Sequence, residues 1–379
     1  MKHKVKIVVG ANYGDEGKGL MSRYFTKEFS EAGHKSVTVL HNGSAQRGHT
    51  VDYADGTRHV FHNFGAGARD GGVTYYADTF LVHPMDFCRE VGELGFTPKV
   101  FCNPACVVVT PFDMLADHVI EDYIEVKNGA REYGSCGYGT WSATERILKR
   151  PEIAYTVSDF ARGGYFLKMH ELWQWAADRV KEYGVELDVI PTWKKYFDYN
   201  SGIFSATCRR FQQDWSTFLN STKPKDFSGV WDTFDSMIFE GAQGLLLDKN
   251  MGSEWVTTSN TGVKNPVKML GDYNDYEAEV CYVTRSYLTR HGEGPLDGET
   301  DSNKVGEIGE DKTNLANPFQ GKLRYAPLNT SVLEKTISAD FSFADSIRYH
   351  RTLAITHCNE VDLSGGDYRS YNPVVVSKF

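Results

Sequence analysis

The chain of 379 residues is 41% hydrophobic, and its 41 basic and 50 acidic residues give a net charge of −9. This acidic balance argues against general binding to nucleic acids or anionic membranes, so any phosphate site must be local. The seven cysteines show no paired framework and no metal-binding spacing, and no signal peptide or membrane-spanning run is present, so we expect a cytoplasmic protein with reduced thiols. No linker or repeat is visible, which favours a single unit over residues 1–379.

The first stretch with a clear pattern covers residues 5–33. Apolar alternation predicts a buried strand up to Val9, and the apolar spacing from Leu20 to Phe29, ending before Gly33, predicts a helix. Glycines and an acid pair lie between them. A strand that enters a helix through glycines makes an anion site, because the first helical N–H groups lack partners and the helix dipole favours negative charge. We therefore predict a P-loop-like phosphate loop after the first strand.

This loop departs from the regular nucleoside-triphosphate motif. Asn12 stands where that motif has glycine, and Gly19 follows Lys18 where Ser or Thr is expected. A tight turn with a solvated lysine is the alternative interpretation of so short a motif. Asp15 is more informative, because a carboxylate beside phosphates is repelled unless it holds a metal ion or acts on the substrate as a base. The loop itself therefore indicates chemistry.

Later stretches continue the alternation of strands and helices. Helices are expected over 114–124 and 165–184, and strands are expected over 36–40, 100–101, 107–110, 236–239, 280–283 and from 353. This order predicts an α/β fold with a central, mostly parallel sheet flanked by helices. In such sheets the loops after the strands line the ligand crevice, which points to residues 42–50, 240–244 and 289–295.

The loop sequence Gly-Asp-Glu-Gly-Lys-Gly resembles the signature of the adenylosuccinate synthetase family. The resemblance covers most of the chain, and this many blocks in order is hard to explain by chance. The further blocks are Gly48-His49-Thr50, Phe239-Glu240-Gly241-Ala242-Gln243-Gly244 with Leu246-Leu247-Asp248, Val256-Thr257-Thr258-Ser259-Asn260-Thr261, and Thr289-Arg290 with Gly292 and Gly294-Pro295.

The resemblance implies a two-step amination of a 6-oxopurine nucleotide. Asp15 would take the N1 proton, the 6-oxygen would attack the γ-phosphoryl group, and the amine of L-aspartate would displace phosphate. His49, otherwise a plain polar loop residue, would stabilise the transferring group. Mg²⁺ would face Asp15 and the carbonyl of Gly48. The residues expected to hold the donor nucleotide are Gly14, Glu16, Gly17, Lys18, Gly19 and Thr50.

The acceptor nucleoside monophosphate is expected to contact several separate segments. The amide of Gln243 can donate and accept at once, which suits a purine edge, although a loop glutamine in water is the alternative. Thr257 could offer its hydroxyl to a phosphate. In the family, an arginine at the position of Arg150 reaches across a dimer interface to that phosphate, which implies a homodimer. The acceptor residues carried over from the resemblance are Gln46, Ser135, Cys136 and Arg150.

The loop expected to bind aspartate departs from the family pattern. In the family it is rich in arginine and preceded by threonines, whereas here Thr313 is followed only by Lys322 and Arg324 as positive residues. Lysine cannot reproduce the planar fork of arginine, so contacts to a carboxylate or ribose must differ in geometry.

Asn359 aligns with the family aspartate that accepts two hydrogen bonds from the guanine of GTP. Aspartate only accepts, whereas asparagine donates and accepts, which suits the amino group and ring nitrogen of adenine. We therefore predict ATP as the phosphoryl donor, with drift in the C-terminal region as the alternative.

Two acceptors fit the same catalytic residues. Inosine monophosphate (IMP) would make the chain an ordinary synthetase, whereas deoxyguanosine monophosphate (dGMP), used by phage relatives, would lead to diaminopurine DNA. A nucleotide-binding switch without ligation chemistry is a third hypothesis, against which the substrate-side motifs argue. The chain is short, as phage relatives tend to be, which favours dGMP and the cytoplasm of a host cell. Departures at nucleoside-contacting positions favour dGMP too, namely Gln46, Arg47, Cys136, Lys322 and Asn359.

Overall fold

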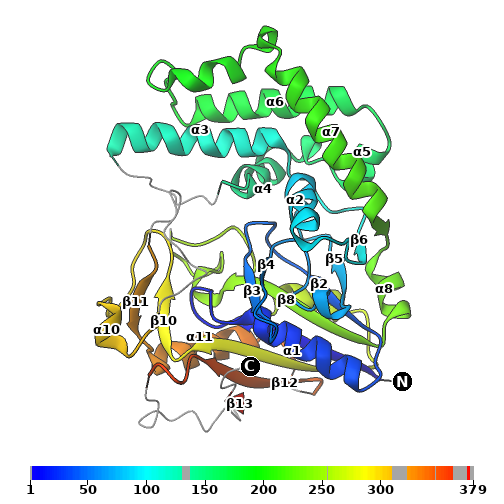
Figure 1. The fold of residues 1–379 in the computed structure, drawn as a ribbon, viewed down its shortest axis with the longest axis vertical. Coiled ribbons are helices and arrows are strands. Elements are labelled where there is room, and N and C mark those ends of the chain that lie inside the picture. The colour runs from blue at the N-terminus through cyan, green and yellow to red at the C-terminus, as the bar shows by residue number, and fades with distance from the viewer. Residues whose placement is uncertain are drawn as a thin grey trace.

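The computed structural model describes residues 2–129, 137–253, 255–309, 322–345, 347–361 and 374–375 (Figure 1). Within these residues nine strands form one central sheet, and every neighbouring pair is parallel. From one edge to the other the strands are β13 (Val374–Val375), β12 (Tyr349–Thr356), β9 (Tyr276–Arg285), β1 (His3–Gly10), β8 (Ser236–Gly244), β2 (Ser36–Leu40), β5 (Val73–Tyr76), β6 (Val100–Cys102) and β7 (Thr222–Pro224). The expected parallel α/β sheet is confirmed.

Strand β1 shows why the sheet has a helix layer on each face. Successive side chains of a strand point to opposite faces. Ile7 and Val9 lie in a core with α8, α9 and α11, whereas Val8 lies in a second core with Met21 and Phe25 of α1. The helices of these two layers are α1 (Lys18–Glu31), α8 (Phe227–Thr233), α9 (Lys264–Leu270) and α11 (Thr330–Phe341).

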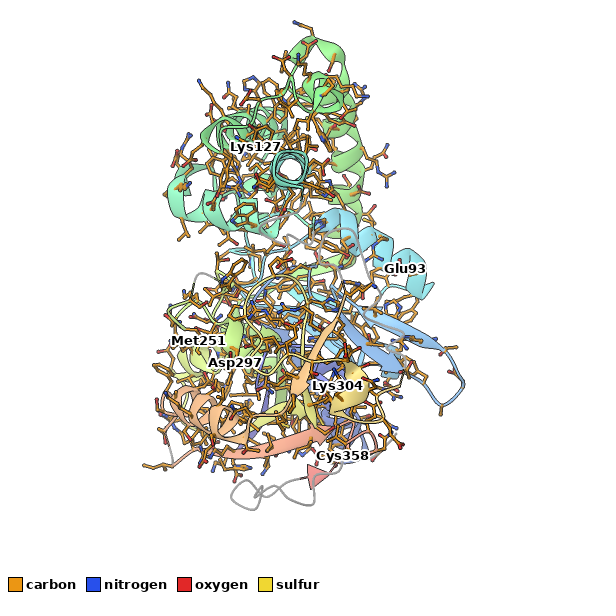
Figure 2. All side chains as sticks on the ribbon, turned by 90° about the vertical axis from the view of Figure 1, so that its left-hand side faces the viewer. Glu93, Lys127, Met251, Asp297, Lys304 and Cys358 are labelled. Carbon is orange, nitrogen blue, oxygen red and sulfur yellow. The ribbon has the colours of Figure 1, made fainter. Side chains whose placement is uncertain are left out.

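A group of helices lies at one end of the long axis, beyond β2, β5 and β6 (Figure 1). Figure 2 shows Lys127 in this group, far from Lys304 and Cys358 at the opposite end. The group shares one continuous core with the sheet, in which Leu40 and Tyr76 are joined by Val119 and Leu172. Its helices are α2 (Pro84–Leu94), α3 (Pro111–Asn128), α4 (Thr140–Lys149), α5 (Val157–Ala161), α6 (Tyr165–Glu182) and α7 (Ile203–Ser221). Of these, α2 lies on the side of the group that faces the sheet (Figure 1).

Two antiparallel pairs and several short helical turns complete the described elements. β3 (His49–Asp52) pairs with β4 (Arg58–Phe61), and β10 (Tyr287–Arg290) pairs with β11 (Arg324–Pro327). The remaining short elements are η1 (Ala68–Asp70), η2 (Pro151–Ile153), η3 (Pro191–Tyr196), η4 (Tyr199–Ser201), η5 (Leu245–Leu247) and α10 (Ser302–Val305).

Most elements expected from the sequence are present. The helices expected over 114–124 and 165–184 are α3 and α6, and the strand expected over 36–40 is β2. The strand expected over 107–110 is wrong, because Val107 and Val108 make only isolated bridges, to Thr156 and Val82. Residues 240–244 were expected to form a loop after a strand. Instead β8 continues through them, and even Glu240 is fully buried.

The described residues also test two expectations from composition. Six of the seven cysteines lie in this part of the chain, and all six are free thiols. Among the described helices, none combines the length and the apolar character that crossing a membrane requires.

Candidate active site

Most of the candidate residues lie at one edge of the sheet. The sheet order places β1 between β9 and β8, with β2 next to β8 and β12 next to β9. Because these strands are parallel, their carboxyl ends share an edge, where ligands bind in open α/β sheets. The phosphate loop follows β1, residues 41–50 follow β2, and the turn containing Asn359 follows β12.

The phosphate loop has a backbone that its sequence dictates. Gly14 and Gly17 have φ of 102° and 100°, in the left-handed region where glycine carries no steric cost. Gly17 caps α1 without any side-chain hydrogen bond, so the first N–H groups of the helix have no side-chain cap. Asn12, at the position where the regular motif has glycine, donates through Nδ2 to Thr284 Oγ1 at 2.9 Å. This amide fastens the loop to the end of β9.

Glu16 and Lys18 point into the protein, at 3% and 4% exposure. Glu16 Oε1 accepts from the N–H of Asn12 at 2.6 Å, and a Cβ at Gly10 would collide with its other oxygen. Burial raises the pKa of Glu16 to about 7, while burial lowers the pKa of Lys18 against the opposing attraction of Glu16. In this arrangement the lysine charge lies beneath the loop, beside the Glu16 carboxyl.

Asp15 is the acidic group of the loop that solvent reaches, with a side chain 34% exposed. Its φ of 58° is unusual for a residue other than glycine, and its carbonyl oxygen accepts from Arg285 Nε at 2.6 Å. The Oδ2 atom lies 3.8 Å from Nε2 of His291. The backbone is therefore held in a strained conformation that turns the carboxylate toward the loop after β10.

His49 belongs to a buried group with Arg47 and Glu240. Its Nδ1 lies 2.6 Å from Glu240 Oε1 and 2.7 Å from an Nη of Arg47, which also pairs with Glu240. The second Glu240 oxygen accepts from the N–H of Ala66 at 3.0 Å. Burial, and then the cations of Arg47 and Lys18, lower the pKa of His49 well below its ordinary value. A neutral imidazole with Nδ1 engaged leaves Nε2 for a ligand.

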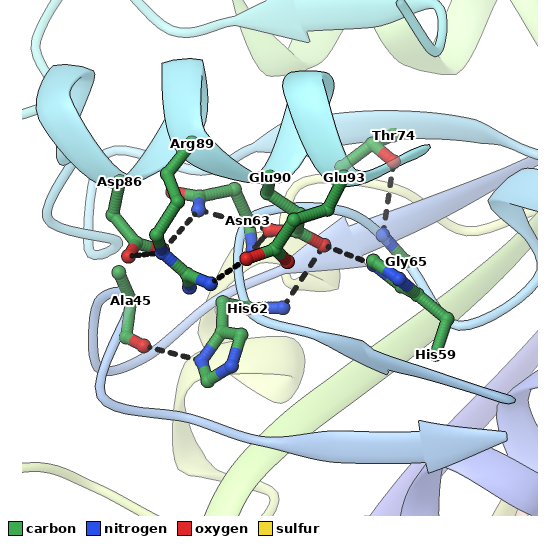
Figure 3. Close-up of polar contacts among 10 residues, drawn as sticks. All are labelled: Ala45, His59, His62, Asn63, Gly65, Thr74, Asp86, Arg89, Glu90 and Glu93. Carbon is green, nitrogen blue, oxygen red and sulfur yellow. Dashed lines mark hydrogen bonds and ion pairs between the residues drawn. The ribbon is translucent and has the colours of Figure 1, made fainter. Parts of the chain in front are cut away.

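A second polar network fixes the segment that carries His49 (Figure 3). Glu90 of α2 is fully buried, and its carboxylate accepts from the N–H groups of His62 at 3.1 Å and Asn63 at 2.6 Å. The ring of His62 lies 2.9 Å from the carbonyl oxygen of Ala45. The loop after β2 is thereby tied to α2 as well as to the sheet.

Three of the predicted acceptor residues lie near this edge. Gln46 Oε1 accepts from the N–H of Ser44 at 2.7 Å and from Thr140 Oγ1 at 3.2 Å. Gln243 has φ of 65°, and its buried Oε1 has no hydrogen-bond partner in the described residues. Thr257 accepts through Oγ1 from the N–H of Ser259 at 3.3 Å. The Oγ1 of Thr50, assigned to the donor nucleotide, is likewise buried and without a partner there.

Other predicted residues lie apart or are committed to other contacts. Arg150 ends α4 in the helical group and pairs with Glu152 on the surface. Arg324 binds the carbonyl oxygens of Gly292 and Gly294, both at 2.9 Å, and pairs with Glu299. Lys322 is exposed. Ser135, Cys136 and Thr313 lie outside the described residues.

Asn359 lies in the turn that follows β12 and is exposed. The turn is closed by the N–H of Glu360, which donates to the carbonyl of His357 at 3.0 Å. Thr356, the last residue of β12, donates through Oγ1 to the carbonyl oxygen of Glu16 at 2.9 Å. The turn therefore begins next to a residue that is bonded to the phosphate loop.

Two potential magnesium donors are accessible from solvent. Mg²⁺ usually takes one or two protein oxygens and completes its shell with phosphates and water. The Asp15 carboxylate and the exposed backbone of Gly48 fit that requirement, and α1 lies close by, since a Cβ at Gly19 would come within 2.9 Å of His49 Cβ. Within the described residues no three His, Cys, Asp or Glu side chains form a metal-binding group.

Two contributors to this site were not assigned a role from the sequence. Glu240 completes the buried group with His49 and Arg47, and His291 faces Asp15. A charged residue inside a mostly apolar strand, as Glu240 is in β8, was the available signal for the first of them. No local pattern could indicate His291, whose partner lies far away in the sequence.

Fold and site together define an α/β protein with its polar residues at the carboxyl edge of a parallel sheet. A model of the adenylosuccinate synthetase family matches residues 7–321, and the chain belongs to this family of carbon–nitrogen ligases.

Curated relatives agree with this assignment. The adenylosuccinate synthetase of Xanthomonas campestris is 27% identical over 316 residues, covering 80% of this chain and 66% of that protein. That of Thermotoga maritima is 25% identical over 319 residues, covering 80% and 69%. The matched region therefore spans slightly less than two thirds of the Xanthomonas protein.

Solved structures share the fold. The fully ligated adenylosuccinate synthetase of Plasmodium falciparum superposes with a TM-score of 0.65 at 19% identity, covering 92% of this chain and 76% of that one. The cyanophage S-2L succinoaminodeoxyadenylate synthetase, bound to dGMP and to dATP as an energy donor, superposes with a TM-score of 0.61 at 15% identity, covering 94% and 85%.

Proposed function

We propose that this chain is a ligase that joins L-aspartate to C6 of dGMP through a 6-phosphoryl intermediate, giving 2-amino-2′-deoxyadenylosuccinate, with ATP as phosphoryl donor. The observation that carries the proposal is an accessible carboxylate, Asp15, inside a glycine-bounded loop at the edge where the buried pair of His49 and Glu240 also lies. A base and a phosphoryl-stabilising group are what this chemistry needs.

In the first step Asp15 takes the proton from N1 of the purine. The electron pair moves onto the 6-oxygen, which attacks the γ-phosphorus of ATP, and the bond to the bridging oxygen of ADP breaks. The N–H groups at the start of α1, between Gly17 and Gly19, would hold the phosphates. When bound by Asp15 and Gly48, Mg²⁺ would neutralise phosphate charge.

In the second step the amine of L-aspartate adds to C6, the C6–O bond breaks, and the departing inorganic phosphate takes up the proton that the amine loses. In the first step His49 would donate from Nε2–H to the transferring phosphoryl group, in the tautomer in which its Nδ1 accepts from Arg47. We assign the carboxylates of aspartate to the region of Thr313, Lys322 and Arg324. The bonds of Arg324 to Gly292 and Gly294 support a role in shaping the loop after β10 there.

The choice of ATP rests on Asn359. Its amide can donate to and accept from the adenine edge, and its turn is attached to the phosphate loop through Thr356. The choice of dGMP rests on the departures at Gln46, Arg47 and Asn359, and the cyanophage neighbour bound to dGMP and dATP supports both choices. IMP is the second candidate acceptor, because the curated relatives are ordinary adenylosuccinate synthetases.

We also propose that residues 1–379 form one unit, which the core shared by the sheet and the helical group supports. The exposed position of Arg150 at the end of α4 is compatible with a homodimer in which it reaches a partner's acceptor phosphate. Gln243 and Thr257 would contact the acceptor, and the enzyme would act in the cytoplasm.

The test is phosphate release in the presence of aspartate and Mg²⁺, with ATP or GTP crossed against dGMP or IMP. Turnover with ATP and dGMP alone is the expected result. Turnover only with IMP and GTP would replace the proposal by the ordinary synthetase reaction. Slow nucleotide hydrolysis that ignores aspartate and acceptor would indicate a nucleotide-binding switch.

A further inference from the structure

His291 is a histidine that neither the proposed reaction nor the family blocks employ. It follows β10, and its Nε2 lies 3.8 Å from Asp15 Oδ2, too far for a hydrogen bond but close enough to share a ligand. The side chain is 13% exposed, and its Nδ1 is buried without a hydrogen-bond partner in the described residues. Nε2 is therefore the ring nitrogen that faces the proposed base.

The loop that carries His291 is held firmly. Arg290 donates to the carbonyl oxygens of Glu293 at 3.1 Å and Pro295 at 2.9 Å, so the loop folds around its guanidinium group. That guanidinium lies 4.7 Å from the ring centre of Tyr13 in the phosphate loop. The relative position of His291 and the phosphate loop is thus fixed by contacts other than their own.

The order of the strands gives His291 a definite place around a bound purine. Asp15 follows β1, His49 lies beyond β2 on one side of β1, and His291 lies beyond β9 and β10 on the other side. A purine whose N1 meets Asp15 must turn its 6-oxygen toward the phosphoryl group and His49. The C2 position, on the opposite side of N1, then faces His291.

We propose that Nε2 of His291 accepts a hydrogen bond from the 2-amino group of the acceptor purine, and so selects 2-amino-6-oxopurine nucleotides over 6-oxopurine nucleotides. In the tautomer with the proton on Nδ1, Nε2 is an acceptor. Guanine presents two adjacent donors, N1–H to Asp15 and the 2-amino group to His291, whereas hypoxanthine presents only C2–H at the second place. This inference rests on the proposed ligase function and adds the group that distinguishes its acceptors.

The test compares dGMP with deoxyinosine monophosphate (dIMP), which differ only in the 2-amino group. The variant His291→Ala should lower kcat/KM for dGMP about tenfold, the effect of one lost hydrogen bond, and change that for dIMP less than twofold. His291→Gln, whose amide oxygen can accept, should recover part of the preference. The matched control is His350→Ala, since His350 Nε2 also lies 3.8 Å from a carboxylate oxygen, that of Glu279, on an exposed part of β12.

The results separate this inference from the ligase proposal. An equal loss for dGMP and dIMP in His291→Ala would overturn the inference, as would a wild-type enzyme that does not distinguish the two nucleotides. If none of the acceptors makes the wild type release phosphate, the ligase proposal fails. Equilibrium dialysis then decides the inference, which requires that His291→Ala weaken dGMP binding about tenfold while dIMP binding stays within twofold.

Discussion

Replacement of Asp15 by asparagine should remove the proposed base and leave the loop in place. With φ of 58° the residue lies in the left-handed region, which asparagine tolerates but which costs alanine about 1 kcal/mol. Its side chain is 34% exposed and 3.8 Å from His291, so the lost charge costs folding at most about 1 kcal/mol. The bond from Arg285 reaches the carbonyl oxygen of residue 15 and is retained. A general base contributes about 10²–10⁴-fold, or roughly 3–5 kcal/mol of barrier.

The assay is phosphate release with saturating ATP, acceptor and aspartate, paired with thermal unfolding of each variant. Asp15→Asn should melt within about 2 °C of the wild type and turn over at least about 100-fold more slowly. Asp15→Ala should lose the same activity and melt lower, because alanine carries more backbone strain at this positive φ. More than about a third of wild-type turnover in Asp15→Asn would refute the role of the carboxylate as base.

Three further changes test the loop, the core and the donor site. Gly17→Ala should abolish nucleotide binding, because the added Cβ would come within 2.8 Å of Thr356 Cγ2. Gly33→Ala, which is also at positive φ but faces open space, should leave binding intact. Titration of both variants with ATP compares them. Burial raises the pKa of Asp340 to about 6, so between about pH 4 and 6 the folded state keeps a proton that the unfolded state has lost. The contribution of Asp340 to the free energy of unfolding therefore falls as the pH rises through this range. Asp340→Asn should remove that part of the pH dependence of the melting temperature. Asn359→Asp should raise the kcat/KM ratio of GTP to ATP at least about tenfold, and an unchanged ratio would contradict its role in donor choice.

The sequence was most informative where a pattern is local and repeated. Residues 36–40 are rich in β-branched side chains, with valine at positions 37 and 39, and are flanked by the polar Lys35 and His41, and β2 has those bounds. The helix α6 begins and ends within two residues of its expected limits for the same reason, namely a periodic apolar face that ends at glycine. Val108 and Val109 show the limit of this reasoning, because both are fully buried, as strand residues would be, yet they lie in a connecting segment rather than in the sheet.

The candidate site divides in the same way. The phosphate loop is a short motif whose neighbouring residues indicate an anion site, whereas the role expected of His49 comes from the resemblance to the family. The partners of both could not be deduced, because Glu240 lies 191 residues from His49 and only the sheet brings them together. Likewise, the inward orientation of Glu16 and Lys18 depends on the space left by Gly10, which only the assembled strands define.

The attachments of the phosphate loop have a consequence for folding. Its contacts with Thr284, Arg285 and Thr356 join residues 272, 270 and 340 positions apart. The loop can therefore reach its final form only after β9 has paired with β1 and β12 has paired with β9, and contacts of such sequence separation form slowly. During synthesis the N-terminal half would carry the motif without its supports. A nucleotide that binds only the finished loop would then stabilise the completed sheet, so its binding can serve as an assay for full-length folding.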